Sequence, residues 1–186
     1  MEWIIALLVL VIDQLSKVYA AEVLSSEALV LIPGMLELTY LKNTGAAWGM
    51  FQGARIPFIL LTAVFLVLCL VFYIKKRKAL TKLSKIILML IVSGALGNLV
   101  DRVLLGYVRD MIYFSLIDFP VFNVADSAIV IGAILLVLET LFTKNGLLEV
   151  AEKTLEKKPK ASSDASNEEQ IVQAEQKDAP EEPHVP

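Results

Sequence analysis

Residues 56–74 read IPFILLTAVFLVLCLVFYI, 19 consecutive residues without a charged side chain. At a rise of about 1.5 Å per residue, a helix of this length matches a hydrocarbon core of about 30 Å. The composition of the 186-residue chain agrees, because 56% of its residues are hydrophobic and 20% are charged, with a mean hydropathy of +0.66. Soluble proteins are about 45–50% apolar, so we expect an integral membrane protein.

Three further segments are apolar enough to span a membrane, and they cover residues 3–20, 86–105 and 123–142. The first contains Asp13 and Lys17, and its end also resembles the cleavage site of a signal peptide. We favour a retained span, because the segment starts without basic residues and the two charges interrupt its apolar part. The predicted fold class is therefore all-α, with four transmembrane helices.

The loop at residues 75–85 sets the expected orientation, because its sequence KKRKALTKLSK carries six basic residues and no acidic one. Short loops rich in Lys and Arg stay in the cytoplasm. The loops at residues 21–55 and 106–121 hold only three basic residues between them, so we expect them outside. Four spans then place both termini in the cytoplasm.

The first outer loop is too long for a simple turn. Its apolar runs at residues 28–32 and 35–41 flank Pro33-Gly34, which predicts two β-segments joined by a turn. The next stretch, NTGAAWGMFQG at residues 43–53, places apolar side chains among glycines. Such a segment is expected to lie on the outer leaflet.

The C-terminal segment differs from the rest of the chain. Residues 1–142 carry a net charge of +1, and residues 143–186 a net charge of −4. We therefore divide the chain into a membrane domain, residues 1–142, and a cytoplasmic tail, residues 143–186. An amphipathic helix is expected over residues 146–158, and the polar composition of residues 159–186 predicts disorder.

The chain has too few cysteines and histidines for several kinds of catalytic or metal site. Cys69 is the single cysteine and His184, near the end of the tail, is the single histidine. This excludes an intrachain disulfide and, in the membrane domain, a Ser-His-Asp triad or a His-ligated metal. The one basic cluster adjoins an apolar span, so no nucleic-acid partner is expected. We expect no metal and no cofactor, and catalysis would use carboxylates, hydroxyls, lysines or the thiol.

Charges within the spans need a reason, because each costs at least about 2.5–3.5 kcal/mol at bilayer depth. Asp13 and Lys17 have the i, i+4 spacing of a helical ion pair, which favours a structural role, with Lys17 extending outward. Asn98, Asp101 and Arg102 share one helix face. For Asp101 and Arg102 a polar staple between helices is slightly favoured over a site.

Asn43 and Gly45 lie just outside the expected membrane, in the stretch NTGAAWG. An Asn among small residues can present its amide to a substrate backbone. The same stretch can equally be a turn with Trp48 as an interfacial anchor. The residues alone leave both interpretations open.

Asp110 and Asp126 are expected to meet, because a short outer loop joins the third and fourth spans. Two carboxylates in a low-dielectric cleft share a proton, so the pair can activate water and protonate a carbonyl or a leaving amine. We assign the ionised base to Asp126 and the proton to Asp110. Two alternatives stay open: Asn123 and Asp126 have the spacing of a capping box, and Asp101, about two turns deeper, competes with Asp110.

Five stretches, in this order, resemble signal peptidase II, the lipoprotein signal peptidase family of bacteria. They are VIDQLSK at residues 11–17, NTGAAWG at 43–49, GALGNLVDRV at 94–103, YVRDM at 107–111 and FNVADSAIVIG at 122–132. The resemblance covers about residues 1–142. It implies a membrane aspartic endopeptidase that cleaves a diacylglyceryl-modified prolipoprotein just before its lipidated cysteine.

The resemblance also implies a fold, a location and residue roles. The fold is a four-helix bundle with a small outer β-cradle and an interfacial helix, in the bacterial cytoplasmic membrane, with the active site at the outer face and membrane lipids around it; a monomer is expected. The implied catalytic pair is Asp110 and Asp126. The residues implied to bind substrate or support the pair are Asn43, Gly45, Asn98, Asp101, Arg102 and Asn123, and the structural polar residues are Asp13 and Lys17.

One residue departs from the family pattern. The family usually has aliphatic residues before the first catalytic Asp and an aromatic residue after it, whereas this chain has Val108-Arg109-Asp110-Met111. Arg109 could pair with a lipid phosphate or lower the pKa of the neighbouring carboxyl. Asp101 is therefore kept as the fallback for Asp110.

Three rival functions remain on the residues alone. A proton-coupled carrier would also place charges within a membrane, but here the charges gather toward the outer side. A Ser-Lys hydrolase could use Ser93 or Ser127, although the lysines lie mainly at the cytoplasmic end. A non-enzymatic adaptor would depend on the acidic tail.

Overall fold

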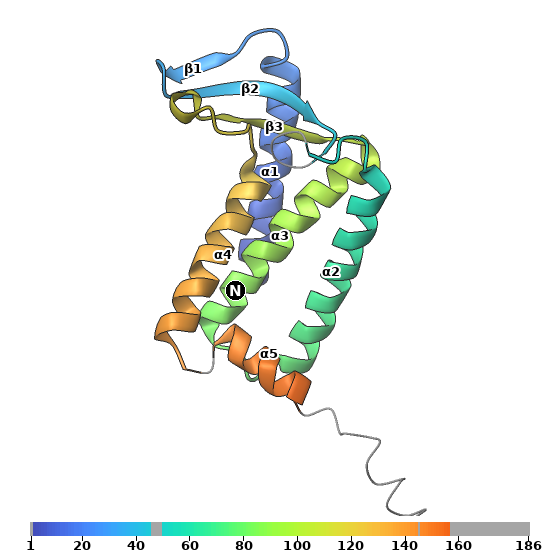
Figure 1. Ribbon diagram of the computed structural model, residues 1–186, viewed down its shortest axis with the longest axis vertical. Helices are drawn as coiled ribbons and strands as arrows, with labels where there is room; N and C mark the ends of the chain where they lie inside the picture. Colours follow the sequence, from blue (N-terminus) through green and yellow to red (C-terminus); the bar gives the residue numbers. More distant parts are fainter. Residues whose placement is uncertain (1, 46–49, 145, 157–186) are drawn as a thin grey trace, which may run out of the picture. The chain divides into compact units, whose positions relative to one another are not determined.

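The computed structural model describes residues 2–45, 50–144 and 146–156. Within them, four long helices form a bundle that carries a three-stranded antiparallel sheet at one end (Figure 1). The helices are α1 (Glu2–Val23), α2 (Arg55–Lys76), α3 (Lys82–Leu104), α4 (Val124–Phe142) and the shorter α5 (Leu147–Glu156). The strands are β1 (Leu29–Ile32), β2 (Leu36–Asn43) and β3 (Val108–Tyr113), followed by the short 3-10 helix η2 (Ser115–Ile117).

The four long helices correspond to the four predicted spans, and each is long and apolar enough to cross a membrane. α3 packs against α1, α2 and α4 and buries the largest share of its span. Small residues allow its close approach to α4, because a Cβ on Gly94 would collide with the carbonyl oxygen of Ala125. The other three helices expose large aliphatic side chains, as expected of surfaces that face lipid.

The sheet has the order β1-β2-β3. Its hairpin turns at Pro33-Gly34, as predicted: Met35 N donates to Ile32 O at 3.0 Å, and Gly34 has φ +69°, a conformation that suits glycine. β3 is an element that we did not predict, because the segment around Asp110 was expected to be a loop. It pairs with β2, so that Asp110 lies opposite Leu41.

A buried carboxylate organises the end of the bundle away from the sheet. Glu139 of α4 is 1% exposed and accepts hydrogen bonds from Thr81 Oγ1 at 2.9 Å, Ser84 Oγ at 2.6 Å and Leu147 N at 3.0 Å. Leu147 and Val150 pack in the same apolar cluster as residues of α2 and α3. Glu139 therefore ties the start of α3 and the start of α5 to α4.

Some predictions fall wholly or partly outside the described residues. α5 corresponds to the amphipathic helix expected over residues 146–158. The expected interfacial segment includes residues 46–49, and the tail expected to be disordered is residues 159–186; neither range is described. The chain separates into two units, Met1–Val150 and Ala151–Pro186, and the domain boundary at residue 142 stays a prediction.

Candidate active site

A cavity of about 570 Å³ lies where β2 and β3 meet α3 and α4. Its polar lining consists of Asn43, Gly45, Asn98, Arg102, Asp110, Asp126 and Ser127, and its apolar lining of Val108, Val130, Ile131 and residues 119–122. Both carboxylates of the predicted pair therefore face one cavity, and four of the predicted supporting residues line it with them.

Asp110 is 1% exposed, and both of its oxygens accept hydrogen bonds. Asn123 Nδ2 donates to Oδ1 at 2.6 Å, and Asn43 Nδ2 donates to Oδ2 at 2.9 Å. Burial raises the pKa of Asp110 to about 6; the hydrogen bond from Asn43 opposes this, and the charge of Asp126 adds to it. Asp110 is thus a carboxyl group that holds a proton closer to neutral pH than an ordinary Asp.

Asp126 lies in the first turn of α4 and serves the helix cap and the cavity at once. Asn123 is the N-cap: its Oδ1 accepts from Asp126 N at 2.9 Å, while Asp126 Oδ2 accepts from Asn123 N at 3.1 Å. The predicted capping box is therefore present. The other oxygen, Oδ1, accepts from Asn98 Nδ2 at 2.7 Å. The cap and the site were alternatives in the sequence, but in the structure they use different oxygens.

Two buried amides connect the carboxylates. Asn123 Nδ2 donates to Asp110 and also to Asn98 Oδ1, at 3.1 Å. Asn98 in turn donates to Asp126. Asn98 Oδ1 also accepts from Lys17 Nζ at 2.9 Å. A continuous chain of hydrogen bonds therefore runs from Lys17 through the amides to both carboxylates.

Arg102 and Gly45 close the cavity on the side of β2. Arg102 Nη2 donates to Gly45 O at 3.3 Å, and its guanidinium lies over the ring of Phe58 at 4.9 Å. Gly45 N donates to Asn43 Oδ1 at 2.9 Å, which leaves the Asn43 amide nitrogen directed at Asp110. A side chain on Gly45 would collide with the carbonyl oxygen of Met50, so this position requires glycine.

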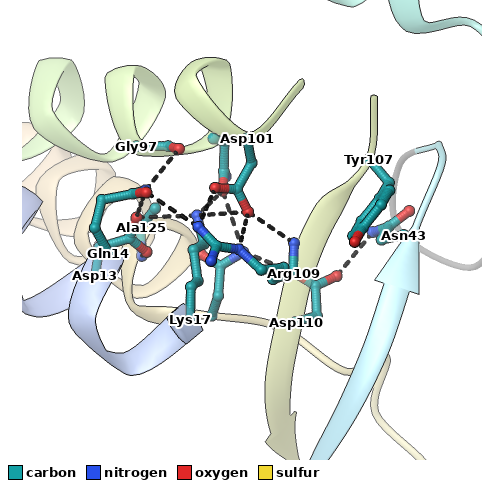
Figure 2. Close-up of polar contacts among 12 residues, drawn as sticks. Asp13, Gln14, Lys17, Asn43, Gly97, Asp101, Tyr107, Arg109, Asp110 and Ala125 are labelled. Atoms are coloured by element: carbon teal, nitrogen blue, oxygen red, sulfur yellow. Dashed lines mark hydrogen bonds and ion pairs between the residues drawn. The ribbon is translucent and has the colours of Figure 1, made fainter. Parts of the chain in front are cut away.

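Behind the cavity, a second polar cluster joins α1, α3 and β3 (Figure 2). Lys17 Nζ lies 2.9 Å from Asp13 Oδ2, which confirms the predicted ion pair. The expectation that Lys17 extends outward is wrong, because it is 0% exposed. Asp13 also accepts from Ala125 N at 2.9 Å, and Gln14 donates to Gly97 O at 3.2 Å. These contacts offset the cost of burying two charges in α1.

Asp101 belongs to this second cluster and does not line the cavity. Its partner is Arg109: Arg109 Nη2 lies 2.7 Å from Oδ1, and Arg109 Nε and N donate to Oδ2 at 3.0 and 2.9 Å. Arg109 and Asp110 extend from opposite faces of β3 (Figure 2). A lipid phosphate, one of the two roles considered for Arg109, is therefore not needed as its partner. Asp101, which competed with Asp110 in the sequence, binds Arg109 instead.

Sequence reasoning missed several contributors. The contact of Lys17 with Asn98, the apolar lining at residues 119–122 and the strand β3 were not predicted. Once β3 is recognised, its period of two would assign Val108 and Asp110 to one face. Ser127 lines the cavity, but its hydroxyl donates to Asn123 O at 3.0 Å, and the Ser93 hydroxyl donates to Leu90 O at 3.0 Å. Both hydroxyls donate to backbone carbonyls rather than to a catalytic base, so these bonds give no support to the Ser-Lys interpretation.

Comparisons with known proteins agree with the arrangement. Residues 5–142 match the family described as Signal peptidase (SPase) II. The lipoprotein signal peptidase of Halothermothrix orenii is 43% identical over 140 residues, which cover 74% of this chain and 93% of that protein. The lipoprotein signal peptidase of Enterococcus faecalis is 41% identical over 133 residues, which cover 71% of this chain and 82% of that protein.

Solved structures show the same fold. A bacterial membrane enzyme determined by the in meso method at 2.3 Å resolution has a TM-score of 0.69 and 35% identity, covering 75% of this chain and 87% of the other. A second such structure, at 1.9 Å resolution, has a TM-score of 0.66 and 34% identity, covering 77% and 94%. These likenesses give no support to a carrier. With four membrane helices, a small sheet and a family match over residues 5–142, the chain belongs to the signal peptidase II family.

Proposed function

We propose that this protein is a membrane aspartic endopeptidase that removes signal peptides from diacylglyceryl-modified prolipoproteins, cleaving before the lipidated cysteine. The observation that carries the proposal is that Asp110 and Asp126 line one cavity and are connected through the amides of Asn98 and Asn123. The relatives named lipoprotein signal peptidases support the substrate class.

The reaction needs one proton shared by the pair. Ionised Asp126 takes a proton from a water molecule, whose oxygen attacks the scissile carbonyl carbon, while protonated Asp110 gives its proton to the carbonyl oxygen. In the collapse of the tetrahedral intermediate, the C–N bond breaks and the departing amine of the cysteine takes up a proton from Asp126. The hydroxyl proton of the intermediate returns to Asp110, so the pair ends as it began.

The assignment of the two roles rests on local environment. Burial, together with the charge of Asp126, raises the pKa of Asp110 and favours its protonated form. Asp126 lies in the first turn of α4 and accepts from a backbone N–H and from an amide, an arrangement that stabilises a carboxylate. Asp110 is therefore the acid and Asp126 the base.

The remaining lining suits an extended peptide with an apolar part. Arg102, which lines the cavity beside Gly45, is placed to donate to a substrate carbonyl. Val130 and Ile131 line the cavity and are 56% and 51% exposed, so the apolar side reaches the outer surface of α4. A signal segment lying in lipid would reach the carboxylates along this side.

The proposal includes a location. The basic loop at residues 75–85 supports cytoplasmic termini, which puts the sheet and the cavity at the outer face of a bacterial cytoplasmic membrane, in contact with lipids. We propose that the membrane domain acts as a monomer.

The test is cleavage of a synthetic prolipoprotein peptide with a diacylglyceryl cysteine, by enzyme purified in detergent. Asp110→Asn and Asp126→Asn should each lose turnover while staying folded. Asp101→Asn should retain some activity, and Asp118→Asn should retain it fully, because Asp118 is exposed and bonded to Tyr113. Loss at 101 and 126 but not at 110 would move the pair deeper, and no cleavage by the wild type would refute the proposal.

A further inference from the structure

Lys17 is buried and contacts three side chains from two helices. Its Nζ lies 2.9 Å from Asp13 Oδ2, 2.9 Å from Asn98 Oδ1 and 3.9 Å from Asp101 Oδ2. The two acidic contacts account for the charge of Lys17. The contact with Asn98 needs a separate explanation, because Asn98 is neutral and lines the cavity.

The chemistry of the ammonium group fixes the orientation of Asn98. An ammonium has N–H donors and no acceptor, so the Asn98 atom that faces Lys17 has to be oxygen. The Asn98 nitrogen then points the other way, to Asp126 Oδ1 at 2.7 Å. A flipped amide would set two donors against each other at Lys17 and two acceptors against each other at an ionised Asp126.

The same polarity continues to the second carboxylate. Since Asn98 turns its oxygen toward Asn123, the Asn123 atom facing it has to be nitrogen, and that nitrogen also donates to Asp110 Oδ1. The Asn123 oxygen is then free to accept from Asp126 N in the cap. Each amide therefore has one orientation that satisfies all its contacts.

We propose that Lys17 is a positioning residue of the peptidase, which holds the Asn98 oxygen and thereby directs amide donors to both Asp126 and Asp110. This inference rests on the proposed function of the two carboxylates. It goes beyond the ion pair between Lys17 and Asp13, which would only hold α1 in the bundle.

Several charged groups surround Lys17 and enter any pH effect. Asp13 on α1 and Asp101 on α3 contact Lys17, and Arg109 on β3 binds Asp101. The charges of Lys17 and of Arg102 on α3 both act on Asp110 of β3 and Asp126 of α4. The charge of Lys17 lowers the pKa of Asp110, against the burial that raises it. Removing that charge should therefore raise the pKa of Asp110, so that the acid keeps its proton to higher pH.

The deciding variant is Lys17→Met, which keeps the length of the side chain and removes its donors and charge. On the folded enzyme we expect kcat to fall about tenfold or more, because the Asn98 amide is free to flip away from Asp126. We also expect the alkaline limb of the pH profile of kcat/KM, which Asp110 sets, to move upward, because the charge of Lys17 lowers the pKa of Asp110. The probe is the diacylglyceryl prolipoprotein peptide in detergent.

The matched control is Asp13→Asn, which breaks the ion pair but leaves the contact between Lys17 and Asn98. It should lower the melting temperature without moving the alkaline limb upward. An unmoved limb in folded Lys17→Met, or an equal upward shift in both variants, would overturn the proposal, because Lys17 would then act only through helix packing.

Lys17→Gln covers the case in which Lys17→Met does not fold. Its amide can still donate to Asn98 but carries no charge, so the limb should move upward while more of kcat is retained than in Lys17→Met; an unmoved limb in Lys17→Gln would overturn the proposal. Asp110→Asn and Asp126→Asn are measured alongside. If the wild type cleaves, these two are inactive and the Lys17 variants keep the wild-type profile, the proposed function stands and this inference fails. If the wild type does not cleave, the proposed function itself fails.

Discussion

At the scale of single residues, the charged side chains in and behind the cavity can be counted. The positive ones are Lys17, Arg102 and Arg109, and the negative ones are Asp13, Asp101, Asp110 and Asp126. These described residues balance to zero only if one of the four carboxyls carries a proton. Asp110, with its raised pKa, is the natural place for it, because excess buried charge is costly.

The pKa of Asp110 predicts a pH dependence. Its usual value near 4 is raised to about 6, and the proposed acid must be protonated. We therefore expect kcat/KM to fall as the pH rises through about 6. The measurement is a pH profile with the exposed-site variant Asp118→Asn as control, which should follow the wild type. A profile that stays flat through this region would contradict the role of Asp110.

Arg109 predicts an effect on stability. Arg109→Val leaves Asp101 buried without its guanidinium partner, and breaking a buried ion pair in this way costs about 3 kcal/mol or more. Thermal unfolding in detergent would measure it. The double variant Arg109→Val with Asp101→Asn should recover much of the loss, because the orphaned charge is gone. Lys42→Met, on the exposed residue paired with Arg109 across the strands, should change little.

No recovery in the double variant would mean that the ion pair is not the source of the loss.

The departure from the family pattern at Arg109 has a local explanation in this chain. Arg109 anchors the strand that carries Asp110 to Asp101 of α3 and, through Nη2 at 3.1 Å, to Gln14 of α1.

At the scale of elements, β3 organises the site. Its alternation directs Asp110 to the cavity and Arg109 to the cluster behind it, so one six-residue strand serves both. The strand was not predictable from its own residues, because VRDMIY is short and charged at its centre. It forms because β2 offers an edge with which it pairs.

The contact between α3 and α4 gives a prediction at the same scale. Gly94→Ala would place a methyl group against the carbonyl oxygen of Ala125, and overpacking of this kind costs about 1–3 kcal/mol. Activity should fall as well, because the shift moves Asn98 on α3 away from Asp126 on α4. Unfolding and kcat are measured together.

Ala133→Val serves as the control for this variant, since residue 133 is exposed on α4. It should leave both quantities near the wild type. A stable, fully active Gly94→Ala enzyme would show that the two helices can separate without cost to the site.

At the scale of the whole molecule, the described residues that line the cavity end at Ile131. An enzyme truncated after residue 158 should therefore keep full activity. Truncation after residue 142 removes the hydrogen bond that Leu147 N donates to Glu139 and two residues of the apolar cluster. The melting temperature of this shorter enzyme should therefore fall. Comparison of the two enzymes in the peptide assay and in thermal unfolding is the test. Loss of activity in the enzyme truncated after residue 158 would show that the removed part of the tail is needed for activity.

The parts of the fold that could be predicted from the amino-acid sequence depend on interactions between residues that are close along the chain. The four spans follow from runs of apolar residues, the hairpin from Pro33-Gly34, and the cap of α4 from the spacing of Asn123 and Asp126. Each is set within one helix or one turn, so local pattern is sufficient.

The remaining features were set by packing between distant segments. Lys17 meets Asn98 across 81 positions of the chain, and Arg109 meets Gln14 across 95. The sequence offered both Asp101 and Asp110 as partners of Asp126. Because both are aspartates, residue type could not decide between them. The tertiary structure separates them, because the pairing of β3 with β2 turns Asp110 into the cavity and leaves Asp101 to neutralise Arg109. Burial makes each of these charges require a specific partner, and only the folded arrangement supplies it.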